Sequence, residues 1–226
     1  MSRAAAGVWF WLAAAREPRT LLAPVTTLIA VELILFAGAD APAQVSVVTA
    51  LAAGFPLLAW TARQVLDAPP DDQQRLVALA LGSRGRAHAC ALVAAGAVVL
   101  GLAAGCLGWG AVRVDADGIS AGELVVGAAL AVATALAATA VGRLASRRFA
   151  GPGAASLVVL VVAPLLTAVL GASRSAAVWP LVPALGPALR RAYDGRLVEG
   201  GPRLVLQMVV WSVVVLALSQ LRARRS

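Results

Sequence analysis

Lysine is absent from this sequence, and all 19 basic residues are arginine. A P-loop needs a lysine that reaches the β- and γ-phosphates of its nucleotide, and a Schiff-base enzyme needs a lysine amine. The chain therefore cannot hydrolyse ATP by a P-loop mechanism of its own.

Histidine and cysteine are nearly missing as well, with one His and two Cys. His88 has no acidic or cysteine neighbours, which makes it a poor metal ligand, and we expect it at the level of the lipid headgroups. Cys90 and Cys106 lie about 24 Å apart along one predicted helix, far beyond the roughly 7 Å that a disulfide can bridge. We expect no catalytic residue, no metal site and no intrachain disulfide.

Charge is sparse: 13% of the residues are charged and 61% are hydrophobic, and the mean hydropathy is +0.86. A soluble domain carries about 25% charged and about 45–50% apolar residues. A soluble chain of 226 residues needs more polar cover than this composition supplies. The sequence therefore predicts an integral membrane protein.

Six apolar stretches are each long enough to cross a bilayer with some tilt. They cover residues 20–39, 45–62, 87–112, 124–141, 154–172 and 204–221. Pro56 and Pro164 lie inside two of them and should bend those helices. Gly101 and Gly105 form a GxxxG pattern, which permits close helix packing in the third stretch or at a subunit interface. We predict an all-α membrane protein with six transmembrane helices.

A further apolar stretch precedes these six, Ala4–Ala15, and it is too short to span about 30 Å of hydrocarbon. One interpretation is a signal peptide that is cleaved after its final alanines. The other is a helix that lies in the membrane interface, with aromatic residues at the headgroup boundary. Arginines that follow at once would oppose translocation, so we favour an interfacial helix. Its aromatic residues are Trp9, Phe10 and Trp11.

The arginines set the expected orientation. If the N-terminus is inside, most of the 19 arginines fall in inner connections and tails. The positive-inside rule then predicts a multi-pass protein of the cell membrane with both termini in the cytoplasm. The excess of basic over acidic residues thus reflects the membrane topology, and we expect membrane lipid to be the partner of the arginines. We expect no nucleic-acid partner.

Two connections are longer than a turn. In the inner connection, Pro69 and Pro70 end the preceding helix, Asp71 or Asp72 can cap a short helix of about ten residues, and Gly82 can end it. The outer connection has four helix breakers between Pro180 and Pro187. They forbid a straight spanning helix and favour a short re-entrant or surface helix.

Glu32 is the only carboxylate well inside a predicted span. A charge at the bilayer centre costs on the order of 2.5–3.5 kcal/mol on insertion scales, so such a residue is a functional candidate. It can line a substrate path or accept a proton. Alternatively, it lies nearer the outer leaflet, or pairs with an outer arginine or a helix amide.

The order of these parts resembles the transmembrane permease subunit of the ABC-2 family of exporters. Those proteins have a cytoplasmic interfacial helix, six spans with both termini inside, an inner coupling helix between spans two and three, and a broken outer helix between spans five and six. Residues 73–86 look like the coupling region. Residues 179–183 look like the aromatic-proline stretch before the last span, although Val182 stands where the family often has Asn.

The resemblance divides a single transmembrane domain, 1–226, into successive parts. These are the interfacial helix 1–19, spans one and two in 20–62, the cytoplasmic coupling region 63–86, spans three to five in 87–172, the extracellular element 173–203, and the last span with its tail in 204–226. It implies a permease that is no enzyme, binds no cofactor, and works with a second permease copy or paralogue and with separate ATPase subunits that bind ATP and Mg.

The resemblance also implies roles for particular residues. Trp9, Phe10 and Trp11 would belong to a hinge-like interfacial helix, and Glu32 to a path for an amphiphilic, lipid-like or peptide-like substrate. Docking of the ATPase would fall to Asp71, Asp72, Arg75, Arg84 and Arg86. An ordinary solvated loop accounts for these charges equally well. A secondary transporter, a membrane-embedded enzyme and a non-transporting scaffold or immunity protein remain alternatives.

Overall fold

The computed structural model describes residues 2–37, 42–112, 119–151, 153–172 and 182–225, and these fold into helices without a strand. The helices are α1 (Arg3–Ala15), α2 (Pro18–Leu35), α3 (Ala43–Asp67), α4 (Asp71–Ala80), α5 (Arg84–Val112), α6 (Ala121–Ala145), α7 (Arg147–Ala150), α8 (Ala154–Ala172), α9 (Leu185–Tyr193) and α10 (Leu197–Arg225). The prediction of an all-α protein is confirmed for this part of the chain.

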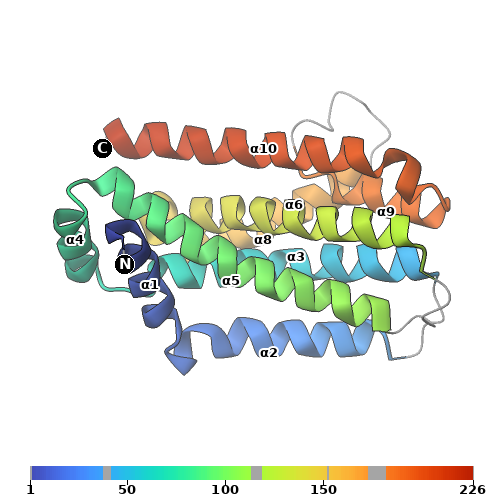
Figure 1. Cartoon of the computed structure of the whole chain (residues 1–226), viewed down its shortest axis with the longest axis horizontal. Helices are drawn as coiled ribbons and strands as arrows, with labels where there is room; N and C mark the ends of the chain where they lie inside the picture. Colours follow the sequence, from blue (N-terminus) through green and yellow to red (C-terminus); the bar gives the residue numbers. More distant parts are fainter. Residues whose placement is uncertain (1, 38–41, 113–118, 152, 173–181, 226) are drawn as a thin grey trace.

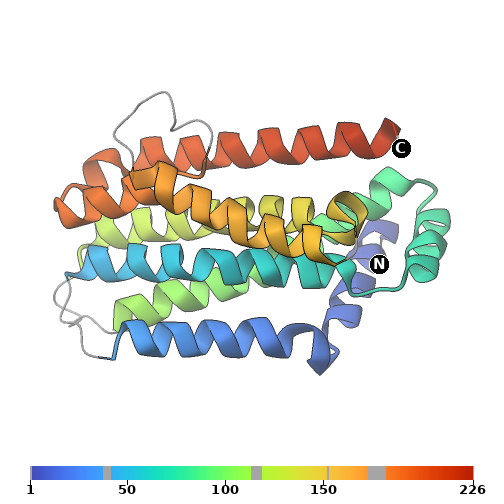
Figure 2. The ribbon, with the colours of Figure 1, turned by 180° about the vertical axis from the view of Figure 1, so that it is seen from behind.

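The long helices run side by side along one axis, as Figures 1 and 2 show from opposite sides. α1 and α4 lie at one end of the bundle and α9 lies at the other, and we call these the α4 end and the α9 end. The start of α1 and the last turns of α10 share the α4 end (Figure 1). An even number of crossings would produce this arrangement.

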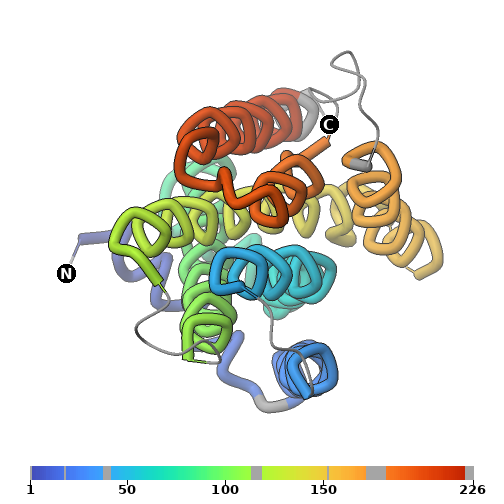
Figure 3. The backbone as a smooth tube through the Cα atoms, turned by 90° about the vertical axis from the view of Figure 1, so that its right-hand side faces the viewer, coloured from blue at the N-terminus to red at the C-terminus, as the bar shows by residue number. Residues whose placement is uncertain are grey.

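α3 is the central helix, as the view along the bundle shows (Figure 3). It contacts α2, α5, α6, α8 and α9, and Leu51, Phe55 and Leu58 are among its fully buried side chains. Its alanines let α6 come very close, because small residues allow helix backbones to approach. A Cβ atom added to Gly142 of α6 would lie 2.5 Å from the Cβ of Ala62.

Within the described residues, five helices are long and apolar enough to cross a membrane: α3, α5, α6, α8 and α10. A sixth crossing follows if α1 and α2, which meet at 71°, are counted together. The predicted first span, 20–39, corresponds mostly to α2. Only 22% of the residues in the most apolar stretch of α8 and of α10 are buried, as expected for helices that face lipid. The chain therefore has the character of a multi-pass membrane protein.

The last long helix begins earlier than the sequence indicated. α10 starts at Leu197 and continues through Pro202, whereas the predicted span starts at Leu204. A proline removes one backbone hydrogen bond from a helix, and a helix of 29 residues can lose one bond near its start. The predicted outer element is therefore shorter, and its last residues belong to α10.

α1 packs against α5 through one face. Gly7, Trp11 and Ala15 are its buried residues, and a spacing of four places them on the same side of a helix. A Cβ atom added to Gly7 would lie 2.9 Å from the Sγ of Cys90. The opposite face of α1 is exposed.

α4 has the ten residues that the sequence predicted. It ends as expected, because Gly82 follows it with a φ of +72°, which glycine adopts without strain. The interpretation of its start was wrong, because the N-cap is Pro70 and no side chain caps the helix. Asp71 and Asp72 lie in the first turn instead, where their negative charge interacts favourably with the positive end of the helix dipole.

α9 is the short helix expected in the outer connection. Its buried residues Leu185, Ala188 and Ala192 share one face, Pro187 is buried as well, and the helix packs against α3 and α8. Val182 and Pro183, which end the aromatic-proline stretch, are buried. Trp179, Pro180 and Leu181 of that stretch lie outside the described residues.

The GxxxG glycines do not mark a close contact within the described part of the chain. A Cβ atom added to Gly101 or Gly105 would meet nothing within 4 Å. A close approach between long helices occurs at Gly142, so the interpretation of Gly101 and Gly105 as a packing site inside the chain was wrong. Their use at a subunit interface stays a prediction.

Candidate functional site

The five residues predicted to dock an ATPase are all exposed at the α4 end. Asp72 and Arg75 form an ion pair of 4.0 Å on α4, with side chains 93% and 77% exposed. Leu76 and Leu79 are exposed on the same helix. The helix therefore presents charged and apolar side chains together. The remaining docking residues are Asp71 on α4 and Arg84 and Arg86 in the first turn of α5.

The three aromatic residues of α1 do not share one environment. Trp9 is exposed, and the guanidinium carbon of Arg16 lies 4.8 Å above its ring centre. Phe10 meets Trp11 edge to face at 6.1 Å, and Trp11 is buried among residues of α3 and α5. Trp9 is thus the one of the three that faces outward, and Trp11 holds α1 on the bundle.

A polar cavity of about 240 Å³ lies beneath α4, and α1, α3, α4, α5, α6 and α7 all contribute to its wall. Its rim carries the exposed side chains of Asp71, Arg75, Arg147 and Arg148. Its floor includes these buried residues with polar groups: Trp11, His88, Arg143 and Ser146. The cavity brings together charges that lie far apart in the sequence.

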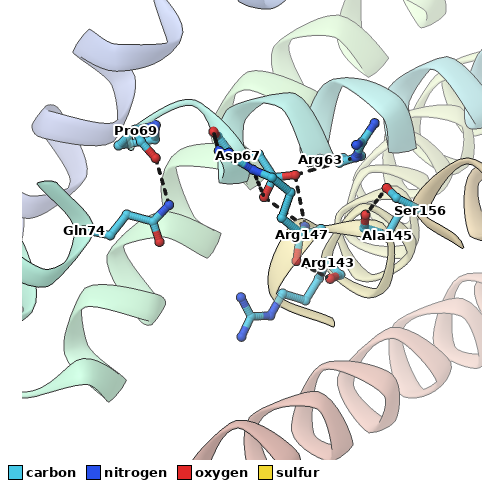
Figure 4. A network of polar contacts seen from close by, with 9 residues as sticks. Arg63, Asp67, Pro69, Gln74, Arg143, Ala145, Arg147 and Ser156 are labelled. Atoms are coloured by element: carbon cyan, nitrogen blue, oxygen red, sulfur yellow. Dashed lines mark hydrogen bonds and ion pairs between the residues drawn. The ribbon is translucent and has the colours of Figure 1, made fainter. Parts of the chain in front are cut away.

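Asp67, the last residue of α3, holds the start of α7 (Figure 4). Its carboxylate accepts the backbone N–H of Arg147, with distances of 3.2 and 3.1 Å to its two oxygens. The same carboxylate pairs with the Nε atoms of Arg63 at 3.6 Å and Arg147 at 3.8 Å. The Arg147 guanidinium also donates to the Asp67 carbonyl. Asp67 thereby fastens α7 to the end of the central helix.

Arg143, near the end of α6, is only 3% exposed. Its guanidinium lies 4.7 Å from the ring centre of Phe149 and extends away from the Asp67 contacts in Figure 4. Its Nε and Nη2 atoms are buried, and no acceptor among the described residues meets them. The Nε1 atom of Trp11, on the same cavity floor, is a second buried donor without an acceptor there.

His88 is buried, and its expected position at the level of the lipid headgroups stays a prediction. Its ring lies 2.6 and 2.8 Å from the Nη1 atom of Arg148. A guanidinium only donates, so the imidazole accepts in this contact. Among the described residues no group of three His, Cys, Asp or Glu side chains could hold a metal ion.

Glu32 lies on α2 and is 5% exposed. It borders a mostly apolar pocket of about 350 Å³ between α2 and α5. Neither carboxyl oxygen meets a nitrogen or hydroxyl donor among the described residues, and the nearby Cys106 thiol, a weak donor, is the group that faces the carboxyl. The alternative of pairing with an arginine is not met within those residues. A role in a substrate path stays a prediction.

We expect Glu32→Met to raise the stability of the purified protein by about 1–3 kcal/mol, because a buried carboxyl whose only facing donor among the described residues is a weak thiol destabilises a fold by about this amount. Thermal unfolding in detergent measures the change. Glu17→Met makes the same chemical change at an exposed position and should leave the stability nearly unchanged. A loss of stability in Glu32→Met alone would mean that the folded protein satisfies this carboxyl.

The sequence analysis predicted no cavity at this end of the bundle. Arg143, Arg147 and Arg148 counted only toward topology, and Asp67 only as part of a loop. One signal was available, because Arg143 follows the apolar stretch 124–141 directly and α6 continues to Ala145. An arginine in the last turn of a mostly buried helix needs an explanation beyond the positive-inside rule.

The chain matches no protein-family model, no curated protein and no solved structure. Its function therefore has to be argued from its own geometry.

Proposed function

We propose that this chain is the permease subunit of an ATP-driven exporter of the ABC-2 type. It would act with a second permease copy or paralogue and with separate ATPase subunits. The position of α4 is the observation that supports this proposal best. α4 is a short exposed helix that joins α3 to α5 at the end of the bundle where α1 also lies.

The surroundings of α4 suit a helix that transmits a partner's movement. α4 contacts the first turns of α5, and α1 packs on α5 as well. Leu81, directly after α4, reaches α1, where a Cβ atom added to Gly7 would lie 3.1 Å from its Cδ1. A displacement of α4 would therefore be carried into both α1 and α5, because packed elements move together rather than deform.

The distribution of arginines supports a cytoplasmic α4 end. Arginines lie on α1, on α4, on α7 and at the ends of α3, α5 and α6 that meet at this end. Cytoplasmic segments next to a membrane carry such an excess. The described arginines at the α9 end are Arg190, Arg191, Arg196 and Arg203. An ATPase partner at the α4 end would then have access to ATP and Mg.

The substrate class follows from the composition of the spans. The helices that border lipid are built mostly of Ala, Val and Leu, and their exposed faces carry few polar groups. Such surfaces suit an amphiphilic, lipid-like or peptide-like substrate better than a small ion, which needs polar groups along its path. The path itself would lie between two permease subunits.

The decisive experiment is co-expression with an ABC ATPase encoded beside this chain, followed by purification through a tag on this chain. We expect the ATPase to co-purify and the complex to hydrolyse ATP. Asp72→Ala with Arg75→Ala should lower hydrolysis severalfold, because this exposed pair would face the partner. If no ATPase co-purifies, the proposal fails, and a secondary transporter or a scaffold is favoured.

The opposite end of the bundle offers a matched control. Arg196 and Glu199 form an exposed ion pair with the same i, i+3 spacing at the start of α10. Arg196→Ala with Glu199→Ala also removes one positive and one negative charge, and hydrolysis should stay at the wild-type rate. Equal losses in both double variants would show that α4 has no special role in docking.

A further inference from the structure

The polar cavity beneath α4 has an imbalance between donors and acceptors. Arg143 and Trp11 are each 3% exposed, and both line the cavity. Between them, three buried nitrogen atoms (Nε and Nη2 of Arg143 and Nε1 of Trp11) meet no acceptor among the described residues. Each of these atoms can only donate. An unpaired buried donor destabilises a protein, so a ligand that completes the cavity must bring acceptors.

The charged side chains that line the cavity also favour a ligand with acceptor groups. The wall carries four arginines and two aspartates. One of the aspartates, Asp67, is already engaged by the backbone N–H of Arg147 and by two guanidinium groups. Asp71, on the rim, is the other. The excess of positive charge excludes a cation and favours an anion.

The lowered pKa of Arg148 also indicates that positive charges lie close together at the cavity. Partial desolvation lowers the pKa of its guanidinium, the nearby Arg84 lowers that pKa further, and Asp71 raises it. An anion beside Arg148 would offset the repulsion. The ring of His88 holds this guanidinium at the cavity. The guanidinium is therefore positioned to bind such a ligand.

We propose that this cavity binds a phosphate group, carried either by the headgroup of an anionic lipid or by free phosphate. A phosphate offers several strong acceptor oxygens, and a guanidinium binds two of them at once. The cavity has room, since about 240 Å³ is several times the roughly 30 Å³ that one water takes in the liquid. Arg143 and Trp11 would hold the oxygens at the floor, and Arg148 would hold them at the rim.

Both sources of the phosphate can reach the site. The cavity lies where long apolar helices end, which is the level of lipid headgroups in a membrane. Basic pockets between membrane helices bind anionic headgroups by this chemistry. The rim is exposed, so free phosphate from the surrounding solution can also enter. The proposal does not depend on the permease function.

The experiment uses the full chain purified in detergent. Thermal unfolding is followed while either inorganic phosphate or phosphatidylglycerol in mixed micelles is titrated, with chloride and phosphatidylcholine as the respective references. A ligand that binds only the folded state raises the unfolding temperature as its concentration rises. We expect a saturable rise with one of the two probes, and the probe that acts identifies the source.

Arg143→Gln should weaken this binding roughly tenfold or more, because it removes charge-assisted hydrogen bonds. Trp11→Phe keeps the aromatic ring and removes one neutral donor, and it should weaken binding roughly fivefold. This second variant carries the test if Arg143→Gln fails to fold. Arg3→Gln is the matched control, since it removes the same charge from an exposed position on α1 and should bind as the wild type.

Two results would overturn the proposal. In one, neither probe stabilises the wild type more than its reference does. In the other, Arg3→Gln loses as much binding as Trp11→Phe, which would mean that the anion is attracted by the charge of the α4 end in general. Neither result bears on whether an ATPase co-purifies with the chain, so the two proposals fail separately.

Discussion

Gly142→Ala is expected to destabilise the protein strongly. The added Cβ atom would lie 2.5 Å from the Cβ of Ala62, 2.6 Å from the carbonyl oxygen of Ala59 and 2.9 Å from the backbone nitrogen of Arg63. Two of these three atoms belong to the backbone of α3, so no side-chain rotation can make room. The helices α3 and α6 would therefore have to separate. This would loosen the packing around Ala59 and Ala62, which are both fully buried.

The size of the effect follows from this geometry. Overpacking in a core costs about 1–3 kcal/mol when side chains can shift, and we expect at least about 3 kcal/mol here because backbones must move. Native proteins are stable by only about 5–15 kcal/mol. The yield of monodisperse protein on size exclusion and the unfolding temperature in detergent measure the loss.

Gly96→Ala is the control for the substitution itself. Gly96 also lies inside a long helix, α5, but an added Cβ atom would meet nothing within 4 Å. Alanine is a better helix former than glycine by about 1 kcal/mol, so this variant should be at least as stable as the wild type. If Gly142→Ala behaves in the same way, the contact between α3 and α6 is wider than described.

Gly142 also shows which part of the fold the sequence could not predict. The positions of the helices followed from runs of apolar residues, since hydropathy is set by each residue alone. Which helix faces which is set by pairs of residues distant in the chain. In a chain with 21 glycines, the GxxxG pattern at Gly101 and Gly105 was as good a candidate for close packing as Gly142, and only the assembled bundle separates them.

The same distinction applies to the candidate site. The exposure of Asp71, Asp72 and Arg75 could be predicted, because a short charged segment between two spans lies in water. The cavity beneath them could not, because its contacts join residues far apart. Arg147 and Asp67, for example, are 80 positions apart in the chain. No local pattern predicts that a carboxylate at the end of α3 meets a backbone N–H of α7.

Asp67→Ala should therefore destabilise the protein far more than its place near a surface connection suggests. The Asp67 side chain is only 14% exposed, and it serves two arginines and a backbone N–H. Removing one member of a largely buried ion pair leaves its partners uncompensated, and we expect a loss of about 3 kcal/mol. Asp67→Asn keeps an acceptor for the N–H of Arg147 but loses the charge, so its loss should be smaller.

Asp72→Ala separates this effect from the general loss of an acid at the α4 end. Asp72 also pairs with an arginine, but both side chains are largely exposed, and exposed pairs contribute little because water and salt screen them. Thermal unfolding in detergent should rank the variants as wild type, Asp72→Ala, Asp67→Asn and Asp67→Ala in order of falling stability. If Asp67→Ala unfolds at the temperature of Asp72→Ala, the contacts of Asp67 add nothing to the stability. α7 would then be held only by its chain connections to α6 and α8, which the Ser156 hydroxyl of α8 joins by donating to the Ala145 carbonyl of α6.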